Sequence, residues 1–342
     1  MPRLLLSCLV ALLVAATPSA GEEVRLRGAM IGTHPTVDDL TTLRGWGANH
    51  IRFQLTWGGF PRGSGDNATL DEYDRWLEGA LKHLDGILPT CEKIGLRVYV
   101  DLHTPPGGRN QWYDCRLFEK PIYQEKFVTV WQQMARRYRG KAAVVGFDLV
   151  NEPSEGKVAK GCERWPALAL RAAKAIRAID PDRTLVYEPA PWGGPEPFKD
   201  LQPLPLTNVV YSFHYYLPME FTHQGVFDRP AGIRYPGVIK GKKWDRERIQ
   251  QTIAPVLAFQ KAHKVPIYVG EFSAPRWAPG GNEWLRDVID VWEEHGWSWA
   301  YHAFREWDGW SAEHSTDRGD HHRAATPTER EKLLRAAFRR GR

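Results

Sequence analysis

Two glutamates stand where a barrel or sheet could use them for chemistry. Glu152 follows the apolar run Val144–Val150, and Glu271 follows the apolar run Pro266–Val269. Short β-branched runs of this kind are typical of buried strands, so each carboxyl group is expected at a strand end. Two carboxyl groups across a groove can cleave a glycosidic bond, because one protonates the leaving oxygen while the other attacks or stabilises an oxocarbenium-like centre. Alternatively, each glutamate pairs with a nearby arginine and ties a loop down. Spacing alone weighs the two interpretations evenly.

The elements that must position these glutamates alternate in type along the chain. Strands are predicted at Val24–Ile31, His50–Leu55, Leu96–Leu102, Val144–Val150, Thr184–Tyr187, Asn208–His214, Pro266–Val269 and Trp297–Phe304. Helices are predicted over residues 36–46, 71–94, 120–138, 165–179, 245–263, 281–295 and 326–339, with a short helix in the Pro-rich stretch 190–205. This alternation predicts an α/β fold, a single (β/α)8 TIM barrel. The runner-up is a doubly wound open sheet, but no GxGxxG or Walker loop follows the first strand.

Polar side chains recur at the carboxyl ends of the predicted strands, where such barrels gather their active sites. They are Arg52, His103, Asn151, Glu152, His214, Tyr216, Glu271 and the aromatic set from His302 to Trp310. The fourth and seventh strands face one another across an eight-stranded barrel. We therefore expect Glu152 and Glu271 to face each other as well.

The residues around the two glutamates resemble glycoside hydrolase family 5, the cellulase-type family of retaining enzymes. The matching segments are Asn151-Glu152-Pro153, Gly270-Glu271-Phe272, Arg52, Asp101-Leu102-His103 and His214-Tyr215-Tyr216. Asn-Glu-Pro alone is a weak motif. In this order and in matching strand contexts, the set is specific and spans nearly the whole mature chain.

The resemblance implies roles for individual residues. Glu152 is expected as the acid/base and Glu271 as the nucleophile of a retaining β-glycosidase. Arg52 and Tyr216 would hydrogen-bond Glu271, and Asn151 would hold the 2-hydroxyl of the sugar. His103 and His214 would line the cleft. Neither a cofactor nor a metal is expected, since two carboxylates suffice for this chemistry.

The expected substrate is a β-linked polysaccharide, first of all a β-1,4-glucan, because Phe221–Gly225 resembles a segment of bacterial endoglucanase-like members. A β-mannan or a β-1,3-glucan is the alternative. Loop tryptophans could stack on sugar rings, and Trp57, Trp112, Trp192 and Trp277 follow strand ends. Trp46, Trp76, Trp131 and Trp292 fall in predicted helices and are expected to pack.

The eighth strand departs from the family pattern. Family members commonly place a Trp near its end, beneath the sugar at the cleavage point. Here Trp299-Ala300-Tyr301-His302 puts His302 at that place. Trp307 is assigned the stacking role instead, and Trp310 competes for it.

Two other function classes compete with a glycosidase. A non-catalytic carbohydrate-binding barrel would need stacking residues but no acid and nucleophile pair. A nucleic-acid or anionic-surface binder is suggested by the formal charge of +5 in 342 residues. However, residues 318–342 hold eight basic and three acidic residues, and so carry the whole excess. That segment is interpreted as a closing helix, with a capping box of Thr328 and Glu331 and a solvated outer face remote from the strand ends. Nucleic acid is therefore not expected as a partner.

The N-terminus has the pattern of an exported protein. Residues 1–20 comprise Arg3, an apolar run from Leu4 to Ala16 and a small-residue exit, as in a secretory signal peptide. A secreted or periplasmic location follows, with residues 22–342 as one catalytic domain, no membrane span and a monomeric state expected. In an oxidising compartment Cys115 and Cys162 are expected to form a disulfide, with Cys91 buried.

Overall fold

Eight parallel strands close into a barrel, as the sequence predicts. The computed structural model describes residues 24–58, 66, 68–226 and 228–341. In barrel order the strands are β1 (Arg27–Ile31), β10 (Ser298–Tyr301), β9 (Ile267–Phe272), β6 (Val209–Tyr215), β5 (Thr184–Tyr187), β4 (Val144–Asp148), β3 (Arg97–Asp101) and β2 (His50–Gln54). Each of the eight predicted strands coincides with one of these, and the fold is a (β/α)8 TIM barrel.

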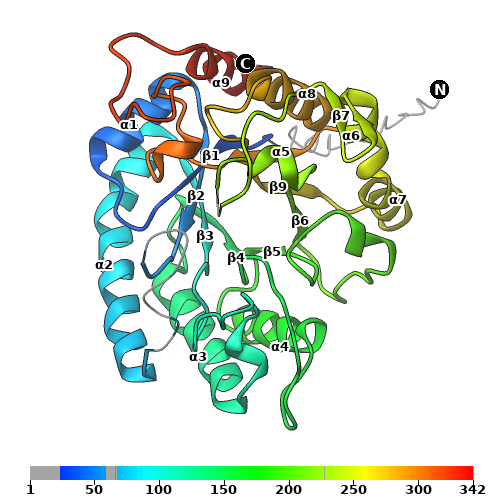
Figure 1. Cartoon of the computed structure of the whole chain (residues 1–342). Coiled ribbons are helices and arrows are strands. Elements are labelled where there is room, and N and C mark those ends of the chain that lie inside the picture. The colour runs from blue at the N-terminus through cyan, green and yellow to red at the C-terminus, as the bar shows by residue number, and fades with distance from the viewer. Residues whose placement is uncertain (1–23, 59–65, 67, 227, 342) are drawn as a thin grey trace, which may run out of the picture.

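Helices form a ring outside the strands (Figure 1). They are α1 (Val37–Trp46), α2 (Leu70–Ile94), α3 (Pro121–Tyr138), α4 (Trp165–Arg177), α6 (Arg246–Thr252), α7 (Ala254–His263), α8 (Gly281–Glu294) and α9 (Glu329–Phe338). The short helix α5 (Met219–Thr222) lies in the connection that follows β6. Residues 188–208, all of them described, contain no α-helix between β5 and β6; the expected short helix is a 3-10 turn at Glu196–Lys199. The helix predicted over 245–263 is divided in two near Pro255, and a small hairpin, β7 (Gly237–Ile239) and β8 (Lys242–Trp244), was not predicted.

Side-chain hydrogen bonds cap the start of α1, α2, α6 and α9. Thr69 caps α2, where its hydroxyl accepts from the Glu72 N–H and the Glu72 carboxylate accepts from the Thr69 N–H. The helix was predicted to begin at Asp71, but its first residue is Leu70. Thr328 caps α9 by accepting from the Glu331 N–H at 3.1 Å, which is half of the predicted capping box. Each such cap satisfies a backbone donor that the helix leaves unpaired.

The core has two layers because successive strand side chains point to opposite faces. Side chains that point outward pack against the helices in one large cluster, which includes Trp46, Trp131 and Trp292. Those that point inward form a smaller cluster of Leu26, Tyr99, Val186, Val210, Tyr268 and Ala300. Much of the high Trp content is therefore packing against the barrel wall.

A one-residue irregularity in β9 changes which way its side chains point. Phe213 of β6 pairs with Val269, but the next residue, His214, pairs with Glu271, so Gly270 is an extra residue. Bulges of this kind re-aim side chains. A Cβ on Gly270 would lie 2.8 Å from the Ser212 hydroxyl and 3.0 Å from His214 Nε2, so only glycine leaves room for both. Tyr268 and Glu271 consequently both reach the barrel interior, although they are three positions apart, a spacing that would put them on opposite faces of a regular strand.

Two expectations from the sequence were wrong. Cys115 and Cys162 are free thiols, as is Cys91, so the expected disulfide is not formed. Placement in loops does not bring two thiols into bonding distance. The basic tail is also not wholly a remote solvated face: Arg330 is buried and donates to the Ala274 carbonyl at 2.7 Å, and Arg318 lies over the Trp277 ring.

The predicted signal peptide, residues 1–20, lies outside the described residues. Within the part of the chain that the structure describes, none of the helices has both the length and the apolar character needed to cross a membrane.

Candidate active site

Glu271 lies in a pocket of hydrogen-bond donors at the carboxyl end of β9. Its Oε1 accepts from Arg52 at 2.7 Å, and its Oε2 accepts from the Tyr216 hydroxyl at 2.8 Å. His302 Nδ1 lies 3.3 Å and His214 Nδ1 3.6 Å from the same Oε2. Burial alone would raise the pKa of Glu271, but the charges of His214, His302 and Arg52 outweigh it and hold the pKa well below its usual range. The surroundings therefore keep Glu271 ionised.

Glu152 is held in a different way, through its backbone. Its φ is +44°, in the left-handed region that L residues rarely adopt. Its N–H donates to Glu188 Oε2 at 2.9 Å, while Arg109 donates to the carbonyl of Asn151 at 2.6 Å and to that of Glu152 at 3.3 Å. These bonds hold the unusual backbone conformation in place. The Glu152 side chain remains 28% exposed and projects into the site.

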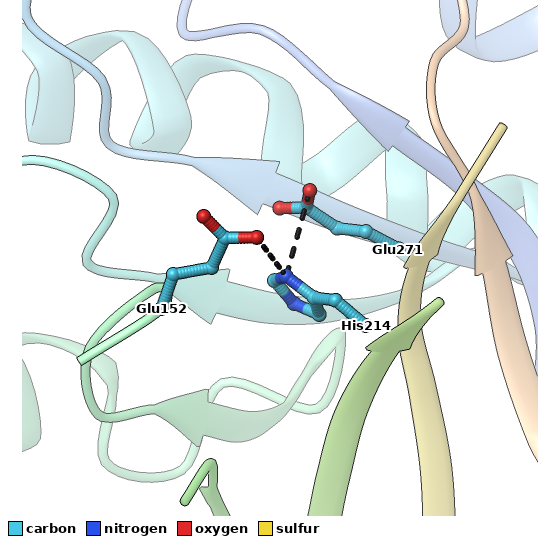
Figure 2. Close-up of side chains that lie close together, drawn as sticks. All are labelled: Glu152, His214 and Glu271. Carbon is cyan, nitrogen blue, oxygen red and sulfur yellow. Dashed lines mark hydrogen bonds and ion pairs between the residues drawn. The ribbon is translucent and has the colours of Figure 1, made fainter. Parts of the chain in front are cut away.

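His214 from β6 lies between the two carboxylates (Figure 2). Its Nδ1 is 2.9 Å from Glu152 Oε1, and its Nε2 is 3.1 Å from Glu188 Oε1. Burial would lower the pKa of His214, but Glu188 and Glu271 raise it well above its usual value. A protonated His214 ring would attract the carboxylates of both Glu152 and Glu271.

One oxygen of Glu152, one oxygen of Glu271 and one nitrogen of His214 all lie within 4.8 Å of one another. Such a spacing could also hold a cation. The hydrogen bond from His214 accounts for the closeness of the three groups without one, so we assign no ion to them.

Arg52 of β2 is the buried hub beneath the site. Its guanidinium meets Asp148 at 2.8 Å, Glu271 at 2.7 Å, and Asp101 and Glu188 at 3.1 Å each, and it donates to the Asn151 amide oxygen at 3.1 Å. A buried guanidinium needs such partners, because an unpaired charge would be strongly destabilising. Burial raises the pKa of Asp148 well above its usual value, although Arg52 opposes that shift. The raised pKa favours the protonated form of the Asp148 carboxyl group.

The structure brings most of the predicted site residues together. Arg52, Asn151, Glu152, His214, Tyr216 and Glu271 form one continuous set of contacts. His103 lies beside this set, 23% exposed, with its Nδ1 2.8 Å from Asp101 Oδ2. Trp307 is half-buried and packs edge-on against Trp277 and Trp310, with ring centroids 6.0 and 5.1 Å away. From the end of β10, His302 is the residue that contacts Glu271.

Several members of the site were not predicted. Glu188 follows β5 and contacts Arg52, His214 and the Glu152 backbone. A carboxylate directly after the fifth strand was the signal that could have found it. Arg109 holds the loop after β4, and Gln54 of β2 pairs with Glu306. Both contacts join segments that lie far apart in the sequence. No sequence pattern marks those contacts.

Of the loop tryptophans, two present open surfaces. Trp112 is 69% and Trp192 39% exposed. Trp57 instead stacks on Trp76, with ring planes 6° apart, and Trp277 donates to the Gln224 carbonyl beneath the Arg318 guanidinium. A groove of about 710 Å³ lies close by, between the loops after β4 and β5, lined by residues that include Ser154, Glu155 and Pro189.

The comparisons with known proteins agree with this geometry. The family model for Cellulase (glycosyl hydrolase family 5) matches residues 18–311 of the chain. The chain belongs to glycosyl hydrolase family 5. It is therefore a glycoside hydrolase, and its substrate is a carbohydrate.

Among family 5 relatives, Endoglucanase C of Acetivibrio thermocellus is 28% identical over 291 residues, which cover 77% of this chain and 82% of the relative. Cellodextrinase A of Ruminococcus flavefaciens is 24% identical over 277 residues, covering 79% and 78%. The solved structure of the endoglucanase Cel5A from Thermotoga maritima has a TM-score of 0.69 at 26% identity, covering 91% of this chain and 96% of that one. The family 5 barrel expected from the sequence is thus confirmed.

Proposed function

We propose that this protein is an extracytoplasmic retaining β-glycosidase that hydrolyses internal bonds of a β-1,4-glucan, with Glu152 as acid/base and Glu271 as nucleophile. The observation that carries the proposal is the short separation of the two carboxylates, with oxygens within 4.8 Å. Retaining glycosidases hold their carboxyl groups roughly 5–5.5 Å apart, whereas inverting enzymes need roughly 6.5–9.5 Å to admit a water. The close pair therefore supports retention.

The surroundings of each glutamate support its role. Glu271 has cationic and hydroxyl donors on both oxygens, as an ionised nucleophile requires. Glu152 has an exposed carboxyl edge and one histidine contact, which leaves room to approach a leaving oxygen.

The reaction proceeds in two displacements. First, Glu271 forms a bond to the anomeric carbon while Glu152 gives its proton to the departing glycosidic oxygen, so that the bond between that oxygen and the anomeric carbon breaks. Next, Glu152 takes a proton from water, the water oxygen bonds to the anomeric carbon, and Glu271 leaves as a carboxylate. Arg52 orients the amide of Asn151 through its oxygen, and the amide nitrogen would then meet the 2-hydroxyl of the sugar.

The choice of β-1,4-glucan follows the names of the relatives, which are endoglucanases and a cellodextrinase. A β-mannan is the alternative with support of its own, since Thermotoga maritima Cel5A has also been solved with mannotriose. A β-1,3-glucan remains the third candidate. A non-catalytic carbohydrate-binding barrel is disfavoured, because binding does not require an acid and a nucleophile with their buried donors.

Azide chemistry tests the two roles separately. In Glu271→Ala, hydrolysis of every substrate should fall by several orders of magnitude, and azide should yield the α-glycosyl azide. In Glu152→Ala, a dinitrophenyl cellobioside should still be attacked, and azide should yield the β-glycosyl azide. Glu196→Gln, whose side chain is 72% exposed on the outer 3-10 turn, is the matched control. Wild-type rates in both glutamate variants would overturn the assignment of the two roles, whereas a wild type without hydrolysis would favour a binding barrel.

Product sizes from carboxymethyl cellulose, mixed-linkage glucan, glucomannan and laminarin test the substrate. A fast fall in viscosity with long early products on the first two supports endo-acting β-1,4-glucan cleavage, and the same pattern on glucomannan alone would favour the mannanase alternative. We also propose that residues 1–20 are removed on export and that the protein is a monomer. N-terminal sequencing of the exported protein and light scattering test these two statements.

A further inference from the structure

The side chain at the end of β10 is unusual for its place. His302 is 9% exposed, and its ring lies between two carboxylates from different elements. Its Nδ1 is 3.3 Å from Glu271 Oε2 and also meets the Tyr216 hydroxyl. Its Nε2 is 3.3 Å from Glu306 Oε2. Because both ring nitrogens are engaged by protein groups, His302 has no nitrogen left for a sugar hydroxyl. It can act on the reaction only through Glu271.

Glu306 is itself fixed in position. The Gln54 amide of β2 donates to Glu306 Oε2 at 2.8 Å, the same oxygen that faces His302. Gln54 is buried, and the Glu306 side chain is 19% exposed. Burial would raise the pKa of Glu306, but His302 and Gln54 outweigh it and lower the pKa. A fixed anion thus stands behind His302, on the side away from Glu271.

The remaining neighbours leave this charge arrangement intact. The Trp310 ring lies 5.8 Å from the His302 ring, and Tyr216 is kept neutral because burial and Glu271 raise its pKa well above the usual value. His223, directly after α5, packs against both Tyr216 and Trp310; burial and then Arg229 lower its pKa to about 4, so it carries no charge at neutral pH. Arg52 contacts the other oxygen of Glu271.

We propose that His302 is a positively charged positioning residue for the nucleophile, held by Glu306 and Gln54, and that it replaces an aromatic sugar platform at the end of β10. The proposal rests on the proposed role of Glu271. Burial would lower the pKa of His302, but Glu271 and Glu306 raise it to about 10, in keeping with the geometry. His302 and Arg52 then clamp opposite oxygens of one carboxylate, which fixes its orientation and keeps it ionised in acid.

The charge of His302 can be measured without any substrate. In protein labelled with 15N-histidine, one imidazole with both nitrogens protonated at pH 8 should vanish in His302→Asn. In Glu306→Gln the same signal should titrate at lower pH, since one anionic partner is gone. A neutral His302 ring at pH 7 in the wild type would overturn the proposal, whatever the protein hydrolyses.

The pH profile of kcat/KM on an aryl cellobioside tests the effect on Glu271. An opposite charge within about 4–6 Å lowers the pKa of a carboxyl group by about 1–3 units, so its loss in His302→Asn should move the acid limb upward by about one pH unit. Activity at pH 5 should therefore fall more than activity at pH 7. Glu306→Gln leaves His302 protonated in acid, so it should not move the limb upward; the lower titration of its His302 signal provides the test if His302→Asn does not fold.

The matched control is His263→Gln on the exposed outer end of α7, which should leave the acid limb in place. A loss of kcat in His302→Asn that is equal at every pH, with an unmoved acid limb, would mean a merely structural role and overturn the proposal. A wild type that hydrolyses none of the glycosides would instead refute the proposed function, while the NMR result would still decide the charge of His302.

Discussion

Glu188 accepts a hydrogen bond from the backbone N–H of Glu152 at 2.9 Å. This bond holds the backbone of Glu152 and leaves the Glu152 carboxyl group uncontacted by Glu188. The other oxygen of Glu188 meets Arg52 and His214, each at 3.1 Å. Its own carbonyl is held by the Trp165 indole of α4 at 2.7 Å. Through its backbone carbonyl and its carboxylate, the buried residue Glu188 therefore links the helix layer to both sides of the candidate active site.

Replacing Glu188 by Gln should affect both stability and rate. The amide must point an N–H group at one of three donors, which leaves a buried group without a partner. We expect a loss of about 1–3 kcal/mol in the free energy of unfolding, measured with denaturant. We also expect a roughly 10- to 100-fold fall in kcat, since a small misplacement of a reacting group is costly. Glu196→Gln is the exposed control, and equal behaviour of the two variants would contradict the positioning role.

His302 should make stability depend on pH in a defined direction. Its folded pKa of about 10 exceeds the unfolded value of 6.5. The stabilisation is therefore fully present below about pH 6.5 and is lost as the pH rises through about 10. The difference in unfolding free energy between the wild type and His302→Gln should shrink over that window in denaturant titrations. A difference that stays constant with pH would show that His302 is neutral in the fold.

Glu271 should act in the opposite direction. Its folded pKa lies well below its unfolded value of 4.5, so its stabilisation is present above about pH 4.5 and is lost as the pH falls. Acid unfolding of Glu271→Gln should accordingly show a shallower dependence on pH below about 4.5 than that of the wild type. A steeper dependence would contradict the depressed pKa.

Exposed and packed tryptophans should separate binding from stability. Trp192→Ala and Trp112→Ala should raise KM for long glucans by roughly 2- to 10-fold, as expected for about 0.5–1.5 kcal/mol of stacking. Their unfolding free energies should change by less than about 0.5 kcal/mol. Trp57→Ala should instead cost about 2 kcal/mol of stability, since its ring stacks on Trp76. An unchanged KM in both exposed variants would remove these rings from the cleft.

Arg276 should control the loop that follows β10. It is buried and donates to the carbonyls of Asp308, Ser315 and Asp320 at 3.0, 2.7 and 2.7 Å. Arg276→Met would remove the donor to the Ser315 and Asp320 carbonyls, at about 1–3 kcal/mol for each one that water does not reach, while the Asp308 carbonyl keeps the Ser311 N–H. We expect faster tryptic cleavage near Arg318 and Arg323 and reduced glucan hydrolysis, because the loop also carries Trp307. Cleavage at the wild-type rate would show that the loop is held by other contacts.

The strands and most site residues were predictable because both depend on local patterns. β-branched runs mark strands, and a barrel gathers the polar residues that end them, so Arg52, Glu152, His214 and Glu271 were found together. Glu188 follows the fifth strand in the same way, although it was not predicted. The sequence thus indicated most of the side chains that the strand ends bring together, but not all of them.

Contacts between distant loops could not be predicted in this way. Gln54 meets Glu306 across 252 residues, and Arg330 of α9 is buried against the loop after β9, although its neighbours in the sequence suggest an exposed basic face. The disulfide expected between Cys115 and Cys162 is not formed, because their position in two loops does not determine how far apart they lie. Loop position in a sequence carries no information on distance.

The extra residue Gly270 has a consequence for anyone who redesigns this barrel. In the segment from Tyr268 to Glu271, one side chain packs in the barrel interior and another lies in the candidate active site, at a spacing that regular pairing would forbid. A graft of this segment onto a strand with uninterrupted pairing would turn the carboxylate outward, into the layer of helices. The transferable unit is therefore β9 together with the facing part of β6, including the small residue that makes the offset possible.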